Sequence, residues 1–278
     1  MEHSEAAAST ALPVSVEAYR RRVDDAIVAE LDRRNDSPFS RPLLKAMQRG
    51  KRLRPILLVL AYESVGGHDV DPLPIAVAVE LTHLESLIHD DILDHDALRR
   101  NATAFHVLHG YEGALLSADF ILSLILDITT RYANRRVGTV LAKAVAEMCE
   151  GQLEELVACK EGRTLRPPDY VRIVSKKTAA LFEASTTLGA LVADADAAEI
   201  HALAEYGRLM GIAYQIHDDV LDCTASPTNQ LLPLLTTNAN LHALAASYQS
   251  EAKKRLGALK ASRAKELLRE ILDFIAFP

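Results

Sequence analysis

Two acidic segments of the chain hold the residues whose types and spacing could do chemistry. The first runs from Leu87 to Asp94 and the second from Gln215 to Asp222, and each contains Asp-Asp-x-x-Asp directly after a histidine. Residues three and four apart are neighbours on one face of a helix, so each trio of carboxylates is predicted to project toward one side. The two trios are Asp90, Asp91 and Asp94, and Asp218, Asp219 and Asp222.

Three like charges on one helical turn repel each other, so a positive charge must offset them. Carboxylate oxygens without cysteine ligands suit a hard cation, and Mg²⁺ usually combines one or two carboxylates with phosphate oxygens and water. Two facing clusters could therefore hold several Mg²⁺ ions around one diphosphate group. A single acidic cluster would more often be a solvated helix end, but two copies flanked by apolar residues argue against that interpretation.

Basic and polar residues that suit a phosphorylated ligand occur elsewhere in the chain. They are Lys51, Arg54, His83, Arg99, Arg100, Lys177, Thr178 and Gln215. Taken alone, each of them would be read as an ordinary surface or core residue. They become candidates for binding because they accompany the two acidic motifs, and because arginine and lysine form strong charge-assisted hydrogen bonds with phosphate.

The elements that must position these residues are helices. Apolar residues recur at helical spacing through most of the chain, and the alternation typical of strands is scarcely visible. The expected helices cover 14–34, 42–48, 53–65, 74–94, 112–131, 136–159, 168–190, 196–222, 238–259 and 261–275. The helix at 74–94 is hydrophobic on most of its surface, so it is expected to be central.

No linker or shift of composition divides the chain of 278 residues. We predict a flexible N-terminal tail over residues 1–13 and a single domain over 14–278. The predicted fold is all-α, one large bundle of about ten helices around a central hydrophobic cavity.

Composition narrows the classes of function. The formal net charge of -7 argues against a general nucleic-acid binder, which would show a basic excess. Cys149, Cys159 and Cys223 lack the spacing of metal ligands and suit a reducing compartment. Residues 1–13 do not resemble a signal peptide, and charges interrupt the most apolar stretch, 114–128. We therefore expect a cytoplasmic protein that is not a membrane protein and does not bind nucleic acid.

In these motifs the sequence resembles the trans-isoprenyl diphosphate synthases, also called polyprenyl synthetases. The similarity extends roughly from Arg41 to Asp222 and rests on seven elements in the order typical of the family. They are Gly-Lys-Arg-Leu-Arg-Pro at 50–55, Glu80-Leu-Thr-His83, Ser86 to Asp91, Asp94-x-Asp96-x-x-Arg99-Arg100, Gly151-Gln152, Lys177-Thr178, and Gly211-x-Ala213-Tyr214-Gln215.

The resemblance implies a role for each candidate residue. Lys51, Arg54, His83 and Arg100 would bind the diphosphate of isopentenyl diphosphate. Arg99, Lys177, Thr178 and Gln215 would hold the allylic diphosphate, and both aspartate trios would bind the Mg²⁺ ions that bridge it. The implied reaction forms an allylic carbocation, which the isopentenyl double bond attacks, and the growing chain needs an apolar tunnel. The helices after Asp90 and around Leu115 to Leu126 are expected to line that tunnel.

Three departures from the family pattern affect this interpretation. The segment 101–106 replaces the usual Gly and Pro-Thr, although asparagine tolerates the backbone angles of such a turn. The segment 223–230 is short and lacks a Gly-Lys pair whose lysine reaches the allylic diphosphate in relatives. Glu85 stands five residues before Asp90, where the family places a side chain that limits product length, with the small Ser86 beside it.

The leading hypothesis is a Mg²⁺-dependent prenyltransferase that makes a product of about fifteen to twenty carbons from isopentenyl diphosphate and an allylic diphosphate. Small Ser86 favours geranylgeranyl diphosphate, and the resemblance implies a homodimer. The alternative is a noncatalytic or weakly active regulatory subunit of a prenyl synthase complex, suggested by the shortened loop. A terpene cyclase fits less well, because such enzymes usually replace the second aspartate trio. Product length and the preferred starter stay open.

Overall fold

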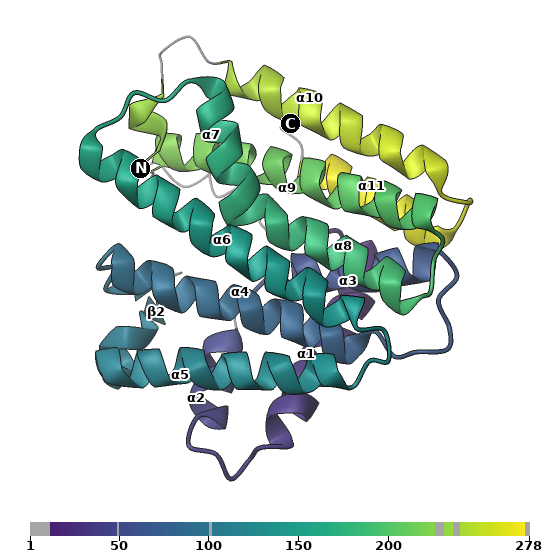
Figure 1. The fold of residues 1–278 in the computed structure, drawn as a ribbon, viewed down its shortest axis with the longest axis horizontal. Coiled ribbons are helices and arrows are strands. Elements are labelled where there is room, and N and C mark those ends of the chain that lie inside the picture. Colours follow the sequence, from purple (N-terminus) through teal and green to yellow (C-terminus); the bar gives the residue numbers. More distant parts are fainter. Residues whose placement is uncertain (1–11, 49, 100–101, 226–230, 236–239, 276–278) are drawn as a thin grey trace, which may run out of the picture.

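The computed structural model describes residues 12–48, 50–99, 102–225, 231–235 and 240–275, without the side chains of 222–225. These residues are almost entirely helical, which confirms the predicted all-α fold (Figure 1). The α-helices are α1 (Glu17–Asp32), α2 (Ser40–Met47), α3 (Leu53–Ser64), α4 (Leu73–Leu93), α5 (Phe105–Thr130), α6 (Arg136–Glu161), α7 (Pro167–Val174), α8 (Ala180–Val192), α9 (Ala197–Ala225), α10 (Leu241–Arg255) and α11 (Arg263–Phe274).

The centre of the bundle is made of helices that are apolar on nearly every side. Every residue of α8 except Glu183 is buried, and α3 packs directly against it. Helix α4, predicted to be central, contacts α1, α3, α5 and α8, and α9 packs between α8 and α10 (Figure 1). Helices rich in alanine and leucine form readily and can approach closely, which explains why this composition yields a helical bundle.

A π-helical turn interrupts the run that we predicted as one helix at 168–190. Between α7 and α8, residues Ser175–Ala179 form this turn, and the chain continues in helical geometry on both sides. A π-turn inserts an extra residue into the helix and is often found at functional sites. It contains Lys177 and Thr178, two of the predicted binding residues.

Helix α5 begins earlier than predicted, at Phe105 rather than at 112. Gly110 lies inside it with φ 74°, a kink that divides the helix into a short first part and a long second part. Glycine adopts this left-handed conformation without the steric cost of a Cβ atom.

Helix α5 has 26 residues and contains a window of mean hydropathy 1.6, of which 39% is buried. By length and composition, α5 could cross a membrane. A single helix of this kind is weak evidence for a membrane-spanning segment, because core helices of soluble proteins share these properties.

Two very short strands join α4 to α5. Strand β1 (Leu98–Arg99) pairs antiparallel with β2 (Ala102–Thr103), and 100–101 lie outside the described residues. This pairing brings Arg99 back toward the end of α4. The predicted tail at 1–13 lies almost wholly outside the described part of the chain, so it stays a prediction.

Candidate active site

A cavity of about 1120 Å³ lies in the middle of the bundle, and both acidic motifs reach it. Asp90 and Asp94 line it from the end of α4, and Asp218 and Asp219 line it from α9. The fold therefore brings together two segments that lie far apart in the sequence. The cavity combines this charged region with apolar side chains from α6 and α8, such as Met148 and Leu181.

The first aspartate trio does not project toward one side as we predicted. Asp90 and Asp94 face the main cavity, whereas Asp91 is buried and lines an adjoining cavity of about 220 Å³. There Asp91 accepts a hydrogen bond from the Nε atom of Arg99. The reason is helical geometry: residues 90 and 94 are four apart and share a face, while residue 91 is turned by about 100° from residue 90.

Burial raises the pKa of Asp90 to about 6, although Lys177 and Arg99 oppose this shift. Burial also raises the pKa of Asp91, and the hydrogen bond and charge of Arg99 work in the opposite direction. A carboxylate that is costly to ionise in a buried position gains most from a nearby cation. The two residues thus lie in an environment that favours the arrival of positive charge.

In the second cluster, Asp219 is held by neutral hydrogen-bond donors. Asp219 is buried and accepts hydrogen bonds from the hydroxyl of Tyr170 and, at 2.7 Å, from Nε2 of Gln215. Thr178 donates to Oε1 of Gln215 at 2.9 Å, so Thr178 fixes the orientation of that amide. Burial raises the pKa of Asp219 to about 6 against the effect of these donors. The side chain of Asp222 lies outside the described residues.

Lys177 forms an ion pair with Glu155 of α6, with 2.6 Å between Nζ and Oε2. Burial disfavours the charge of Lys177, but Glu155 and Asp90 outweigh this effect and raise its pKa. Gly151 makes the contact possible, because a Cβ atom there would lie 2.4 Å from the backbone nitrogen of Lys177. Helix α6 can therefore approach the π-turn closely enough to place Glu155 beside the lysine.

Three residues predicted to bind the diphosphate of isopentenyl diphosphate line the same cavity: Lys51, Arg54 and His83. Arg99, predicted to hold the allylic diphosphate, lines it too. The guanidinium of Arg54 also stacks on the ring of Phe182, with 4.5 Å between its carbon and the ring centroid. Arg100 lies outside the described residues, so its predicted role is not placed.

Several residues that position the site were missed by our reading of the sequence. Arg52 is buried, adopts φ 56°, and forms ion pairs with Glu80 at 2.7 Å and Asp24 at 2.8 Å. These pairs anchor the loop that carries Lys51. Glu155 and Tyr170 were missed too, although Glu155 follows Gln152 by three residues and so lies near the same helical face. No local pattern marks Tyr170, because its partner Asp219 is distant in sequence.

The donor set suits a divalent cation that is shared with a ligand. Within the described part of the chain, no group of three His, Cys, Asp or Glu side chains is arranged to hold a metal ion unaided. The available donors are carboxylate oxygens, which Mg²⁺ and Ca²⁺ prefer, and Mg²⁺ commonly completes its coordination with water and substrate phosphates. The residues therefore fit a metal that binds together with a diphosphate.

The chain-length candidates lie on α4, before Asp90 in the sequence. Glu85 and Ser86 both line the cavity. Our expectation that residues around Leu115 to Leu126 line the tunnel was wrong, because no described residue of α5 reaches the cavity. Leu115, Leu116, Leu122 and Leu126 are instead exposed on the outer face of α5. Helix α6 supplies the apolar wall in their place.

Comparison with known proteins shows the family to which this chain belongs. A sequence profile described as polyprenyl synthetase matches residues 37–266. The chain is similar to a geranylgeranyl diphosphate synthase of Methanosarcina mazei, with 44% identity over 63% of this chain and 56% of that protein. It is also similar to heptaprenyl diphosphate synthase component 2 of Geobacillus stearothermophilus, with 33% identity over 84% of this chain and 75% of that protein.

A solved structure with bound ligands shares the fold of this chain. It is a polyprenyl synthase from Caulobacter crescentus in complex with calcium and isoprenyl diphosphate. Its TM-score to this chain is 0.80 at 26% identity, covering 94% of each chain. The alignments to the first curated relatives span only 54–62% of their length, a little over half.

Proposed function

Because the chain belongs to the polyprenyl synthetase family, we propose that it is a Mg²⁺-dependent trans-prenyltransferase that condenses isopentenyl diphosphate with an allylic diphosphate. The observation that carries this proposal is the shared cavity, which aspartates of both clusters line together with Lys177. A cavity lined by acidic, basic and apolar side chains suits a ligand with a diphosphate head and a hydrocarbon tail.

The diphosphate of the allylic substrate would lie between the two clusters. Asp90, Asp94 and Asp218 are the residues that would hold Mg²⁺, with Asp222 completing the second trio. Bound Mg²⁺ would neutralise the diphosphate and stabilise the negative charge that develops as it leaves. Lys177 and Arg99 add positive charge on the protein side, and Gln215 would donate to the same group once it turns from Asp219.

Isopentenyl diphosphate would bind at the basic side of the cavity. Lys51, Arg54 and His83 line that side, and Arg100 is proposed to join them. This site is made of cations, so it can hold a diphosphate without metal. Because Arg52 is paired with Asp24 and Glu80, its charge is used to hold the loop and not the ligand.

The chemistry follows from this placement. The allylic C–O bond breaks, its electron pair stays with the diphosphate, and the allylic cation remains in the apolar part of the cavity. The double bond of isopentenyl diphosphate supplies the electrons of the new C–C bond. The resulting cation loses a proton, which the released diphosphate can accept. The residues Lys177 and Arg99 act as preorganised charge for the leaving group.

The product is proposed to have about fifteen to twenty carbons. The small Ser86 on the cavity wall and the similarity to a geranylgeranyl diphosphate synthase favour geranylgeranyl diphosphate. We propose a homodimer in the cytoplasm, and the outer face of α5 is the surface for a second copy. Its exposed apolar side chains include Leu108, Tyr111, Leu115, Leu116, Leu122 and Leu126. A face of this kind is unusual on a monomer.

A second candidate function is a noncatalytic or weakly active subunit of a prenyl synthase complex. The similarity to a protein named as component 2 of a heptaprenyl diphosphate synthase motivates it. The segment 223–230 is short and lacks the lysine that family members carry there. It lies largely outside the described residues. The aspartates retained on both helices favour the catalytic reading.

A product assay tests the proposal. Purified protein, Mg²⁺ and labelled isopentenyl diphosphate are incubated with dimethylallyl, geranyl or farnesyl diphosphate, and the chains are sized after phosphatase treatment. A discrete product that disappears with EDTA is expected. A folded protein that binds diphosphate yet makes no product from any starter would support the subunit reading.

A further inference from the structure

The connection from α10 to α11 concentrates positive charge in a chain whose formal net charge is -7. Residues 253–265 include six lysines and arginines and no aspartate or glutamate. Leu256 and Leu259, between these cations, are buried and hold the connection against the bundle. Five of the six cationic side chains are exposed, and together we call them the basic corner: Lys253, Lys254, Arg255, Lys260 and Arg263.

Helix stability accounts for only part of this charge. The first three cations occupy the last turn of α10, where the helix dipole favours positive charge. Lys265 has a structural role as well, because its amine donates to the carbonyl of Leu259 at 2.7 Å. Lys260 precedes α11 and Arg263 is its first residue, at the end of a helix where the dipole disfavours cations. Neither of these two positions is explained by the local structure.

Carboxylates of the protein compensate the basic corner incompletely. Three of its cations form ion pairs: Lys253 with Asp273, Lys254 with Glu251, and Arg255 with Glu205. Such solvent-exposed pairs contribute little free energy, so an external anion can replace the carboxylate. Within the part of the chain that the structure describes, Lys260 and Arg263 form no ion pair.

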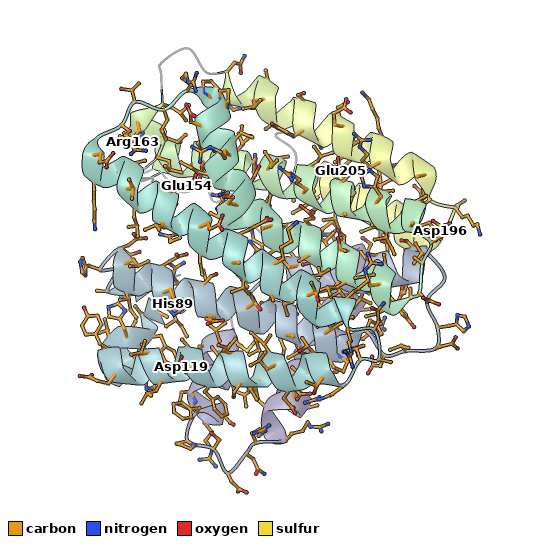
Figure 2. All side chains as sticks on the ribbon, viewed as in Figure 1. His89, Asp119, Glu154, Arg163, Asp196 and Glu205 are labelled. Atoms are coloured by element: carbon orange, nitrogen blue, oxygen red, sulfur yellow. The ribbon has the colours of Figure 1, made fainter. Side chains whose placement is uncertain are left out.

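The basic corner lies away from the surface that we propose for the dimer. Helices α10 and α11 pack on α9 and α3, whereas α5 packs on α4 and α6. Figure 1 shows α5 and α10 on opposite sides of the bundle. In Figure 2, Glu205, the partner of Arg255, lies well apart from Arg163 at the end of α6. A homodimer formed through α5 would therefore leave the basic corner exposed.

We propose that the basic corner docks the enzyme on a membrane surface that carries anionic phospholipids. The contact is peripheral, because the cations approach the lipid phosphates and no helix enters the bilayer. The rest of the chain is acidic overall, so the same membrane repels the other faces and selects this one.

The choice of a lipid surface over another polyanion rests on the proposed prenyltransferase function. Its substrates and product are diphosphates that carry hydrocarbon chains, and such chains partition into a bilayer more strongly with each added carbon. A synthase held at the bilayer releases its product where the hydrocarbon chain can enter the lipid directly.

The size of the effect follows from the number of cations. Each lysine or arginine close to an anionic bilayer raises the affinity about fivefold. Replacing both cations that have no carboxylate partner, in Lys260→Gln with Arg263→Gln, should therefore weaken binding about 20-fold to 30-fold. The attraction should disappear at about 1 M salt, where the Debye length falls to about 3 Å.

The matched control removes the same number of charges elsewhere. Lys160→Gln with Arg163→Gln neutralises two exposed cations at the end of α6, and should bind vesicles like wild type. Circular dichroism and the product assay in solution, without vesicles, should show that both double variants are folded and active.

The experiment is sedimentation of the full chain with vesicles in the absence of substrates. We expect binding to vesicles of phosphatidylcholine mixed with phosphatidylglycerol, and none to vesicles of phosphatidylcholine alone. Equal binding of wild type and the Lys260→Gln, Arg263→Gln variant would overturn the inference, as would a lack of binding to the mixed vesicles. Tighter binding to duplex DNA than to the mixed vesicles would overturn the assignment to lipid.

This result is separable from the test of the proposed function. Vesicle binding requires no turnover, so its absence would leave the prenyltransferase activity intact. Absence of product from every starter would instead contradict the proposed function, whatever the protein binds.

Discussion

The two acidic clusters have the same sequence pattern but different partners in the fold. In the first, the buried Asp91 is bound by the cation Arg99, and Lys177 acts on Asp90. In the second, the buried Asp219 is bound by two neutral groups, the hydroxyl of Tyr170 and the amide of Gln215. Neutral donors orient a carboxylate without cancelling its charge.

This difference implies a division of labour. The first cluster already has protein cations close by, so part of its negative charge is compensated before any ligand arrives. In the second cluster, neutral donors orient the carboxylate of Asp219, so these two hydrogen bonds leave its charge, when it is ionised, to be offset by an incoming cation.

The largest effect is expected when either cluster loses a carboxylate that faces the cavity. Asp90→Asn and Asp218→Asn should each lower kcat by about 100-fold to 1000-fold, because groups that stabilise developing charge have effects of this size. Single-turnover measurements at saturating Mg²⁺ provide the test, with the exposed Asp69→Asn as control. If both variants turned over like wild type, the assignment of these residues would be wrong.

Replacing the lysine of the π-turn comes next. Lys177→Met should lower kcat by about 100-fold, because it removes a cation from the leaving group and leaves Glu155 without its partner. Lys176→Met is the matched control, since that neighbouring side chain pairs with Glu150 and Glu154 outside the cavity. Comparable losses in the two variants would show that general stability and not the position of the charge is responsible.

A smaller effect should separate the second cluster from the first. Tyr170→Phe removes a donor to Asp219 and should weaken Mg²⁺ binding about tenfold, the usual size for a group that orients a metal ligand. Isothermal titration of Mg²⁺ in the presence of inorganic diphosphate measures this without turnover. Tyr206→Phe, which removes a buried hydroxyl bonded to the carbonyl of Leu268, controls for lost stability. Equal Mg²⁺ affinity in both variants would remove Tyr170 from the site.

The least effect on turnover, but a measurable one on stability, concerns protonation of Asp219. Its pKa is about 6 in the folded, metal-free protein against an ordinary value of 3.8, so the folded state binds a proton that the unfolded state has released. This contribution to the free energy of unfolding is present below about pH 4 and is lost as pH rises through 6. It amounts to at most about 3 kcal/mol.

Chemical unfolding of the metal-free protein between pH 4.5 and pH 7.5 measures this contribution. The wild-type protein should lose stability over this range relative to Asp219→Asn, which cannot ionise, and Asp69→Asn should follow wild type. Parallel curves for wild type and Asp219→Asn would show that burial of Asp219 has no such cost.

Much of the fold could be predicted from the sequence because its signals are local. The apolar run of α4 and its termination near Asp94 placed that helix within a residue of its observed bounds, Leu73–Leu93. The helix predicted from 112 begins at Phe105, and its first turns are separated from the rest by the kink at Gly110. The π-turn was missed because it leaves the apolar pattern almost unchanged while altering which side chains point inward.

The pairing of side chains could not be predicted in the same way. Asp91 and Asp94 are both acidic residues of one motif, yet only Asp94 lines the main cavity. The strand pair that returns Arg99 to Asp91 is two residues long on each side, too short to leave a period in the sequence. The link from Tyr170 to Asp219 joins residues 49 positions apart, and only packing of α7 on α9 brings them together.

The order of residue types along the chain was enough to predict the helices, two acidic clusters suited to a metal ion and a set of cations suited to phosphate, because each of these predictions depends on local sequence. The packed bundle decided which carboxylates face the cavity, which are bound to the protein, and that α6 and not α5 forms its apolar wall. Those outcomes depend on the angles at which helices cross and on how closely glycine lets them approach, as at Gly151 beside Lys177.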